Sequence, residues 1–443
     1  MNTDFEWGVV TTAHQCEGKG KDGRGDSIWD TLERQKGKIF NDATSERGSG
    51  FYDHMEEDIN RLEDLGANAF RFSFNWSRLF PSSDGIPNQK AVSFYHKMLD
   101  LLQEKGIKAN ATIYHWDLPQ WAEDLGGWAD RKIVDLFVSY AKFLFKEFGS
   151  KVSHFVTLNE PIAVYVGYAG QSFAPALGNR EKALKANYHM LLAHGRAVEE
   201  FRKFNFKHTD IGIVIDIWKC VPARPDYEPD VLAAKFREEE AFLPYLMPLF
   251  FGQYSPYMQE CYAKINFDVK KEDLECMKQP IDFLGINVYS RHFISVDEKL
   301  GNNMERAKLQ PENFTKVFWE IYPNAISEAV DLIRTRFSKD IPIIVTEIGS
   351  CFKDVIADDG KIYDYDRAKF LELYIQNLFE KMKTDKNIHG VYVWGYLDAF
   401  EWTGGYEDQF GLIYVNPVDL SRTPKLSYHK YKEIIKNFSE KLS

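Results

Sequence analysis

Short β-rich apolar runs recur eight times along this chain, and long helix-periodic stretches separate most of them. This alternation predicts a parallel sheet, and eight strands are the number that closes an α/β fold into a (β/α)8 TIM barrel. A doubly wound open sheet is the alternative that alternation alone leaves open. The runs are Phe5–Thr11, Asn68–Phe74, Lys108–His115, His154–Glu160, Asp210–Asp216, Ile281–Tyr289, Ile341–Glu347 and Gly390–Asp398. The expected helices are Asp53–Leu65, Gln89–Lys105, Asp130–Phe148, Arg180–Phe204, Ala325–Phe337 and Asp366–Lys383.

The chain offers no obvious domain boundary. No linker rich in proline, glycine or serine, no charge block and no low-complexity tract interrupts the pattern. We therefore expect a single domain over residues 1–443. The longest stretches without a regular pattern are Gly18–Gly50, Asp216–Glu240 and Tyr289–Phe318, which follow the first, fifth and sixth strands. In a barrel such long βα loops lie at the C-terminal face, where active sites sit.

Charge and cysteine content narrow the partners and the compartment. The chain has 66 acidic and 55 basic residues, a net charge of −11 that is opposite to the basic surface of a nucleic-acid-binding protein. The N-terminal residues lack the features of a secretion signal, and no later stretch is apolar enough to span a membrane. The five cysteines are scattered and predict neither a disulfide framework nor a zinc site. We expect a cytoplasmic protein that binds neither nucleic acid nor membrane.

Two glutamates stand at the ends of hydrophobic strands, Glu160 in FVTLNEP and Glu347 in IIVTEIG. Burying one carboxylate is costly, and for a single such residue a structural ion pair and catalysis are equally open. Two of them across a barrel mouth are what glycoside hydrolysis requires, since one group protonates the leaving oxygen while the other attacks the anomeric carbon or activates water. Other polar and aromatic residues at strand ends are Gln15, Arg71, His115, Trp116, Asp117, Asn159, Asn287, Tyr289, Trp394, Glu401 and Trp402.

Six motifs follow one another between Phe5 and about Tyr431. They are Ala13–Gly18 (AHQCEG), Arg71–Pro81 (RFSFNWSRLFP), Tyr114–Pro119 (YHWDLP), Thr157–Pro161 (TLNEP), Thr346–Gly349 (TEIG) and Phe400–Trp402 (FEW). In this order they resemble the signature blocks of family 1 glycoside hydrolases, the β-glucosidase family. The resemblance covers essentially the whole chain and implies a retaining, two-step hydrolysis of a small-molecule or oligosaccharide β-glycoside, with no cofactor and no metal.

The resemblance also implies roles for individual residues. Glu347 would be the nucleophile, supported by Arg71 and Tyr289, and Glu160 the acid/base. Asn159 would bind the 2-hydroxyl of the sugar, and Trp319 would form the aglycone platform. The remaining glycone contacts would come from Gln15, His115, Trp116, Tyr289, Trp394, Glu401 and Trp402. We expect Glu347 to stay ionised beside Arg71, and the pKa of Glu160 to be raised by the neighbouring carboxylate.

Several positions depart from the family pattern: Ile348, Ala399, Ile162, His14 and Cys16. None removes a charged catalytic group, although they weaken any detailed prediction of the substrate. His115 and Asp117 could form part of a metal site, but a third ligand at suitable spacing is missing, so we expect no metal.

Negative charge near Glu401 favours an unphosphorylated β-glucoside, with β-galactosides or β-fucosides also open. Glu401 would repel a phosphate, and Glu407 and Asp408 in the following loop add to that repulsion. The alternatives are a sugar-binding pseudoenzyme, a transglycosidase on the same fold and a 6-phospho-β-glucosidase. The sequence does not predict the natural aglycone or the oligomeric state.

Overall fold

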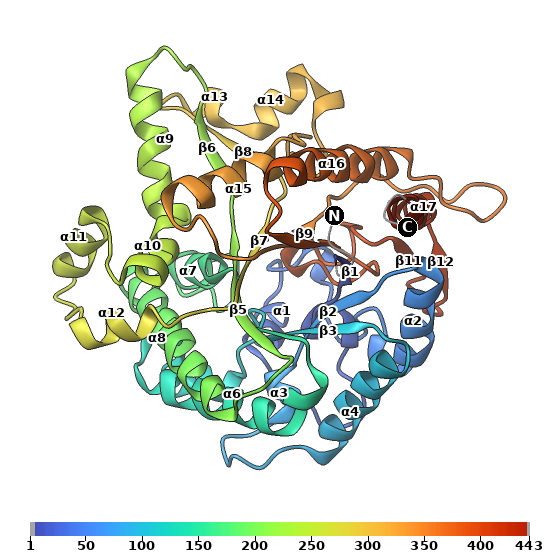
Figure 1. Ribbon diagram of the computed structural model, residues 1–443, viewed down its shortest axis with the longest axis horizontal. Coiled ribbons are helices and arrows are strands. Elements are labelled where there is room, and N and C mark those ends of the chain that lie inside the picture. Colours follow the sequence, from blue (N-terminus) through green and yellow to red (C-terminus); the bar gives the residue numbers. More distant parts are fainter. Residues whose placement is uncertain (1–4, 441–443) are drawn as a thin grey trace.

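The computed structural model describes residues 5–440, and a closed barrel of parallel strands lies at its centre (Figure 1). The barrel is closed because β1 pairs with both β2 and β10, so the predicted TIM barrel is confirmed and the open sheet is excluded. Its strands are β1 (Glu6–Val10), β2 (Ala69–Ser73), β3 (Lys108–Tyr114), β4 (His154–Asn159), β5 (Asp210–Asp216), β7 (Phe283–Asn287), β9 (Ile343–Ile348) and β10 (Ile388–Val393).

The barrel strands contribute to two apolar clusters, one outside and one inside the barrel. On β5, Ile213 and Ile215 belong to the large outer core under the helices, whereas Val214 belongs to a smaller cluster inside the barrel. This alternation is the period of two that a strand imposes on its side chains. The inner layer leaves little room, since a Cβ on Gly8 would come within 2.1 Å of the Tyr392 ring.

Long helices surround the barrel, and six of them match the predicted ranges to within two residues. They are α2 (Phe51–Leu65), α4 (Gln89–Glu104), α6 (Lys132–Phe148), α8 (Arg180–Phe204), α15 (Ala325–Arg336) and α16 (Tyr365–Thr384), and they are joined by α17 (Leu426–Glu440), which the sequence analysis did not predict. The shorter helices at the barrel include α1 (Ile28–Glu33), α3 (Trp76–Leu79), α5 (Gln120–Asp124), α7 (Pro161–Ala169), α10 (Leu243–Phe251), α11 (Pro256–Lys264) and α12 (Lys271–Met277). Among residues 5–440 no helix has both the length and the apolar character that crossing a membrane requires.

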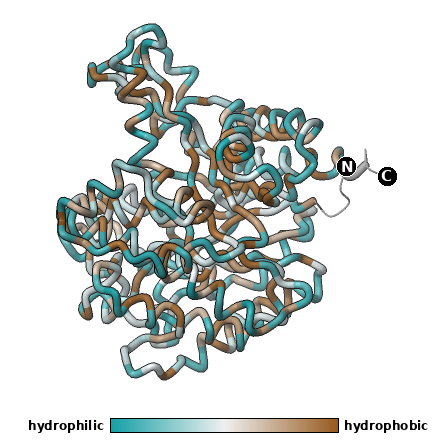
Figure 2. The backbone as a smooth tube through the Cα atoms, turned by 60° about the vertical axis from the view of Figure 1, so that its left-hand side comes forward, coloured by the Kyte–Doolittle hydropathy of each residue, from teal (hydrophilic) through white to brown (hydrophobic). Residues whose placement is uncertain are grey.

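The stretches expected to be irregular contain regular elements. The loop after β5 holds β6 (Lys219–Pro222) and α9 (Glu228–Ala241), and the loop after β7 holds β8 (Arg291–Ile294), α13 (Glu298–Gly301) and α14 (Asn303–Leu309). The strands β6 and β8 pair in parallel, so the two loops form one projection from the barrel (Figures 1 and 2). Neither strand has a partner in its own loop, which is why local patterning did not predict them.

The eighth strand is shorter than predicted. Its expected range ended at Asp398, but β10 ends at Val393, and the chain then runs as a loop toward a separate hairpin. That hairpin consists of the antiparallel strands β11 (Ile413–Val415) and β12 (Arg422–Pro424). Leu397 forms an isolated bridge to Ile413, and the Tyr396 backbone N–H donates to the carbonyl oxygen of Val10 at 3.0 Å, so the segment contacts both the hairpin and β1.

A buried ion pair ties the C-terminal hairpin to α2. Arg422 donates from Nε and Nη2 to the two carboxylate oxygens of Asp58, at 3.0 and 2.9 Å, and Nη2 also donates to the carbonyl oxygen of Ser49 at 2.9 Å. Both side chains of the ion pair are fully buried. Breaking such a pair by removing one partner leaves an uncompensated charge in the core.

We therefore expect Arg422→Met to lower the free energy of unfolding by about 3 kcal/mol. The matched control is Lys432→Met, which removes the exposed ion pair from Lys432 to Asp64 at 2.6 Å and is expected to cost less than about 1 kcal/mol. Urea unfolding followed by circular dichroism measures both. Equal losses in the two variants would contradict a structural role for the Arg422–Asp58 pair.

Candidate active site

Glu347, near the end of β9, is held by donors from two other strands. Arg71 on β2 donates from Nη1 to Oε1 of Glu347 at 2.5 Å, and the Tyr289 hydroxyl, two residues after β7, donates to Oε2. All three side chains are buried. Both oxygens of Glu347 are thus fixed in direction, as the resemblance predicted.

Glu160 is placed by an unusual backbone conformation. It follows β4 with a φ of 42°, a left-handed value that non-glycine residues rarely adopt, and Pro161 begins α7 directly after it. Its backbone N–H donates to the carbonyl oxygen of Val214 at 2.9 Å, and its Oε1 accepts from Nδ2 of Asn287 at 2.5 Å. The strained backbone turns the carboxyl group toward Asn287 at the barrel mouth.

Asn159 connects the two glutamates to the neighbouring strands. Its Oδ1 accepts from Nη2 of Arg71 at 2.6 Å and from Nδ2 of Asn287 at 3.2 Å, and its Nδ2 lies 3.2 Å from Nε2 of His115. Because the amide Nδ2 is a donor, Nε2 of His115 accepts and the ring is neutral, in agreement with burial lowering the His115 pKa well below its usual range. Trp116 donates from Nε1 to the Asn159 carbonyl oxygen at 2.8 Å.

The two glutamates titrate in different surroundings. Burial, the charge of Asp216 and the charge of Glu347 raise the pKa of Glu160 well above its usual range. Burial also raises the pKa of Glu347, which the sequence analysis did not anticipate, but the charge of Arg71 and the hydrogen bond from Tyr289 oppose that rise. Glu347 therefore has specific support for its ionised form, whereas Glu160 accepts from one neutral amide.

Gln15 and Glu401 form a second set of polar side chains at the mouth. Gln15 is on a short helical turn after β1, and its Nε2 donates to Oε2 of Glu401 at 3.1 Å, while its Oε1 accepts from the Thr12 hydroxyl at 2.7 Å. Burial, Asp408 and Glu347 raise the pKa of Glu401 well above its usual range. Gln15 and Glu401 together present hydrogen-bonding groups suited to hydroxyls.

Aromatic rings surround these polar groups. Trp402 lies 5.0 Å from Trp116 between ring centroids, and His115 lies 6.2 Å from Trp394 and 6.4 Å from Trp402. The structure therefore brings the predicted glycone residues Gln15, His115, Trp116, Asn159, Trp394, Glu401 and Trp402 to one mouth. Sequence analysis missed Trp29 behind this wall, 4.5 Å from Trp402, because nothing in its local pattern distinguishes it from a core residue.

Trp319 lies in another part of the mouth, against Tyr289 at 5.0 Å and Trp218 at 5.2 Å between centroids. Trp218, which sequence analysis also missed, stacks on His292 of β8 at 4.6 Å. Its position two residues after the end of β5 is the signal that could have identified it. The loops after β5 and β7, which form the projection, therefore also carry Trp218 and Trp319, in the part of the mouth where the aglycone is expected.

The departures from the family pattern leave this geometry in place. The ring of His14 is parallel to that of Trp402, with a centroid distance of 5.9 Å and an interplanar angle of 1°. Ile348 is buried in the outer core, Ile162 and Ala399 are half-buried, and burial raises the pKa of the Cys16 thiol to about 12. None of the five removes a hydrogen bond to Glu160 or Glu347.

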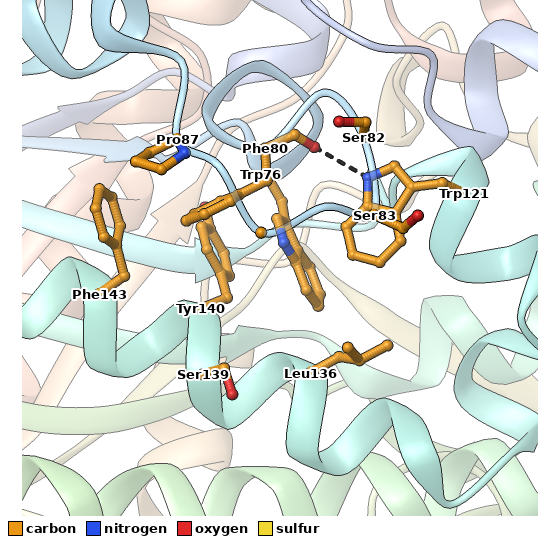
Figure 3. Close-up of a pocket in the computed structure, with 11 residues that line it drawn as sticks. Trp76, Phe80, Ser82, Ser83, Pro87, Trp121, Leu136, Ser139, Tyr140 and Phe143 are labelled. Atoms are coloured by element: carbon orange, nitrogen blue, oxygen red, sulfur yellow. Dashed lines mark hydrogen bonds between the residues drawn. The ribbon is translucent and has the colours of Figure 1, made fainter.

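The structure separates the mouth from other candidate sites. A hollow of about 260 Å³ between the 80–87 loop and α6 is lined by Trp76, Phe80, Trp121 and Tyr140 (Figure 3), but no carboxylate lines it. Burial raises the pKa of Asp117 to about 8, which makes it a poor partner for His115 in binding a metal. In the described part of the chain no three His, Cys, Asp or Glu side chains are grouped as metal ligands would be.

Comparison with known proteins agrees with this geometry. A sequence model of the family described as "Glycosyl hydrolase family 1" matches residues 1–440. The chain belongs to glycosyl hydrolase family 1. It is therefore a glycoside hydrolase, and the identity that the six motifs indicated is confirmed.

Relatives of this family 1 hydrolase match it over nearly their full lengths. Beta-glucosidase A of Acetivibrio thermocellus is 36% identical over 440 residues, covering 98% of each chain. Beta-glucosidase A of Thermotoga maritima is 35% identical over 436 residues, covering 98% of this chain and 97% of the relative. The solved GH1 beta-glucosidase from Exiguobacterium antarcticum B7 is 33% identical, covers 99% of each chain and superimposes with a TM-score of 0.92.

Proposed function

We propose that this family 1 hydrolase cleaves unphosphorylated β-glucosides with retention of configuration, Glu347 acting as the nucleophile and Glu160 as the acid/base. The observation that carries the assignment is the unequal support of the two glutamates. Arg71 and Tyr289 both donate to Glu347, while Glu160 accepts from the neutral amide of Asn287. A group held ionised is suited to attack, and a group with a raised pKa is suited to donate a proton.

In the first step, the Glu160 carboxyl gives its proton to the glycosidic oxygen as the bond from the anomeric carbon to that oxygen breaks. A Glu347 carboxylate oxygen forms the new bond to the anomeric carbon, and the aglycone leaves as a neutral alcohol or phenol. In the second step, Glu160, now a carboxylate, takes a proton from water. The water oxygen bonds to the anomeric carbon and Glu347 leaves, so two inversions give net retention.

The same arrangement accounts for the change in the role of Glu160. While Glu347 is ionised, its charge contributes to the raised pKa of Glu160. Esterification of Glu347 removes that charge, so the Glu160 pKa falls during the first step. A general acid thereby becomes a general base of suitable strength for the second step.

The glycone contacts follow from the polar groups of the mouth. Gln15 and Glu401 would bind hydroxyls on one side of the sugar, and Asn159, close to Glu160 and fixed by Arg71, would bind the 2-hydroxyl. Trp394 and Trp402 would supply apolar faces for the sugar C–H groups. Trp319, beside Trp218, would contact the aglycone.

The charges near Glu401 support an unphosphorylated sugar. Negative charge is already unfavourable there, since burial and the charges of Asp408 and Glu347 raise the pKa of Glu401. Lys316 is a nearby cation, but it pairs with Glu407 at 3.1 Å and Asp408 at 3.2 Å. A phosphate would have to compete with both carboxylates for this lysine.

We also propose that the 443 residues form one catalytic domain and that the protein works in the cytoplasm. The match of one family model to nearly the whole chain supports the first proposal. All five cysteines are free thiols, which supports the second because disulfides are rare in reducing compartments. Cell fractionation with an antibody to the protein tests the location.

The direct test of the function is a panel of p-nitrophenyl glycosides. We expect release of phenolate from the β-glucoside and a kcat/KM at least about tenfold lower for its 6-phosphate, because the phosphate meets the carboxylates of the mouth. β-Galactoside and β-fucoside complete the panel. Binding of glucosides without cleavage would support a pseudoenzyme, and transfer to an added alcohol in preference to water would support a transglycosidase.

Replacing the nucleophile changes the stereochemistry. We expect Glu347→Ala to lose phenolate release and sodium azide to restore it, because azide can attack the anomeric carbon once, in the space that the side chain leaves. The product is then the α-glycosyl azide, identified by proton NMR. Formation of the β-azide by Glu347→Ala would contradict the assignment, whereas Glu160→Ala is expected to give the β-azide.

Replacing Tyr289 tests whether its hydroxyl affects the ionisation of Glu347 as well as the position of that side chain. Tyr289→Phe removes a donor that lowers the Glu347 pKa, so that pKa rises and the acid limb of kcat/KM moves to higher pH, by up to about one pH unit. We also expect kcat to fall roughly ten- to a hundredfold. The control is Tyr431→Phe, whose buried hydroxyl donates to the Gly8 carbonyl oxygen at 2.9 Å, remote from Glu347. An unchanged acid limb in Tyr289→Phe would contradict this account.

A further inference from the structure

Asp216 ends β5 and takes no part in the hydrogen bonds that hold Glu160 and Glu347. Val214 on the same strand lies in the cluster inside the barrel, while Ile213 and Ile215 pack outward. Because side chains alternate along a strand, Asp216 faces the barrel interior two residues beyond Val214. The strand ends there, so a further carboxylate stands at the mouth that contains Glu160 and Glu347.

The strand register places Asp216 next to the group that holds Glu160. Asp216 pairs with Asn287 across β5 and β7, and Nδ2 of Asn287 donates to Oε1 of Glu160 at 2.5 Å. On the other side, the Glu160 backbone N–H donates to the carbonyl oxygen of Val214, two residues before Asp216. Asp216 and Glu160 are therefore fixed to the same two strands at the same level of the barrel.

The charged and titratable groups around Asp216 do not neutralise it. Glu160, which follows β4, Glu347 of β9 and Tyr245 of α10 all interact with it electrostatically. The cation that acts on it is Arg237 of α9, which itself pairs with Glu240 at 3.4 Å. Within residues 5–440 no lysine, arginine or histidine lies within ion-pair distance of Asp216.

We propose that Asp216 is a positioning residue for the proton of Glu160: its negative charge, held at the end of β5, keeps the Glu160 carboxyl protonated to higher pH. The proposal rests on the proposed function, in which Glu160 is the acid. Asp216 itself exchanges no proton with the substrate. Its effect is electrostatic, since a second negative charge in a buried mouth disfavours ionisation of the first.

The electrostatic surroundings of Asp216 and Glu160 agree with the proposal. Burial raises the pKa of Asp216 to about 7, and the charge of Glu347 contributes to that rise. The pKa of Glu160 is raised well above its usual range, and among neighbouring charges Asp216 contributes more to that rise than Glu347 does. The repulsion between the two carboxylates is mutual, so removing the charge of Asp216 makes ionisation of Glu160 easier.

The test is the pH dependence of kcat/KM for p-nitrophenyl β-glucoside in wild type and Asp216→Asn. The amide keeps the shape of the side chain and removes its charge, so the Glu160 pKa falls and the alkaline limb moves to lower pH by about one pH unit. On that limb kcat/KM falls about tenfold, because the protonated fraction of Glu160 at a given pH falls about tenfold when its pKa falls by about one. The acid limb, which follows Glu347, stays where it is.

Asp210→Asn is the matched control, since Asp210 begins the same strand at the far end of the barrel and its loss changes the net charge equally. Its alkaline limb is expected to coincide with that of wild type. A lower kcat/KM in Asp216→Asn at every pH, with both limbs unmoved, would overturn the proposal and leave a structural role. If Asp216→Asn does not fold, Asp216→Ser is measured in the same way. Absence of hydrolysis by wild type would instead overturn the proposed function.

Discussion

The fully buried guanidinium of Arg71 is the group on which the active site depends. It is fully buried, and an unpaired buried charge is very costly, so acceptors from the protein must stabilise it. They come from β9, through Glu347 and the Thr346 carbonyl oxygen, and from β4, through Asn159. Two strands that are not neighbours of β2 are thereby held in register at their carboxyl ends. The guanidinium that pairs with Glu347, the proposed nucleophile, also holds Asn159 beside Glu160.

Around Arg71 the mouth carries an excess of carboxyl groups. Burial raises the pKa of Glu160, Glu347, Asp216 and Glu401, and repulsion from neighbouring carboxylates adds to the rise for Glu160, Asp216 and Glu401. Such a site is poorly matched to an anionic sugar and well matched to a transition state in which the sugar ring gains positive charge, as in glycoside hydrolysis. A positive charge that develops between these groups favours their ionised forms, and the carboxylates in turn stabilise that charge. The same surplus of negative charge therefore supports both the proposed acid role of Glu160 and the proposed preference for a neutral glycone.

The sequence predicted most of the elements and site residues whose positions the barrel strands set. Six long helices and the barrel strands followed from hydrophobic period, and Gln15, Glu160 and Glu347 followed from their positions at strand ends and from the family motifs. It did not predict the pairing of β6 with β8, because each strand lacks a partner within its own loop. It missed Trp29, which resembles any core aromatic, and it extended the eighth strand through apolar residues that the C-terminal hairpin holds. The raised pKa of Glu347 also escaped it, since burial is a property of the folded mouth.

The site therefore has two parts: one is positioned by the barrel strands and the other by loops. Glu347, Glu160 and Asn159 stand on or directly after barrel strands, so their separation is fixed by strand spacing and shear, which every residue of the barrel helps to maintain. Trp218 and Trp319 stand on loops, and the projection built by β6 and β8 determines where they lie. A substitution in that projection can move the aglycone platform without disturbing the register that sets the two glutamates. Under the proposed function, the two glutamates and the residues that contact the aglycone are therefore positioned by separate parts of the fold.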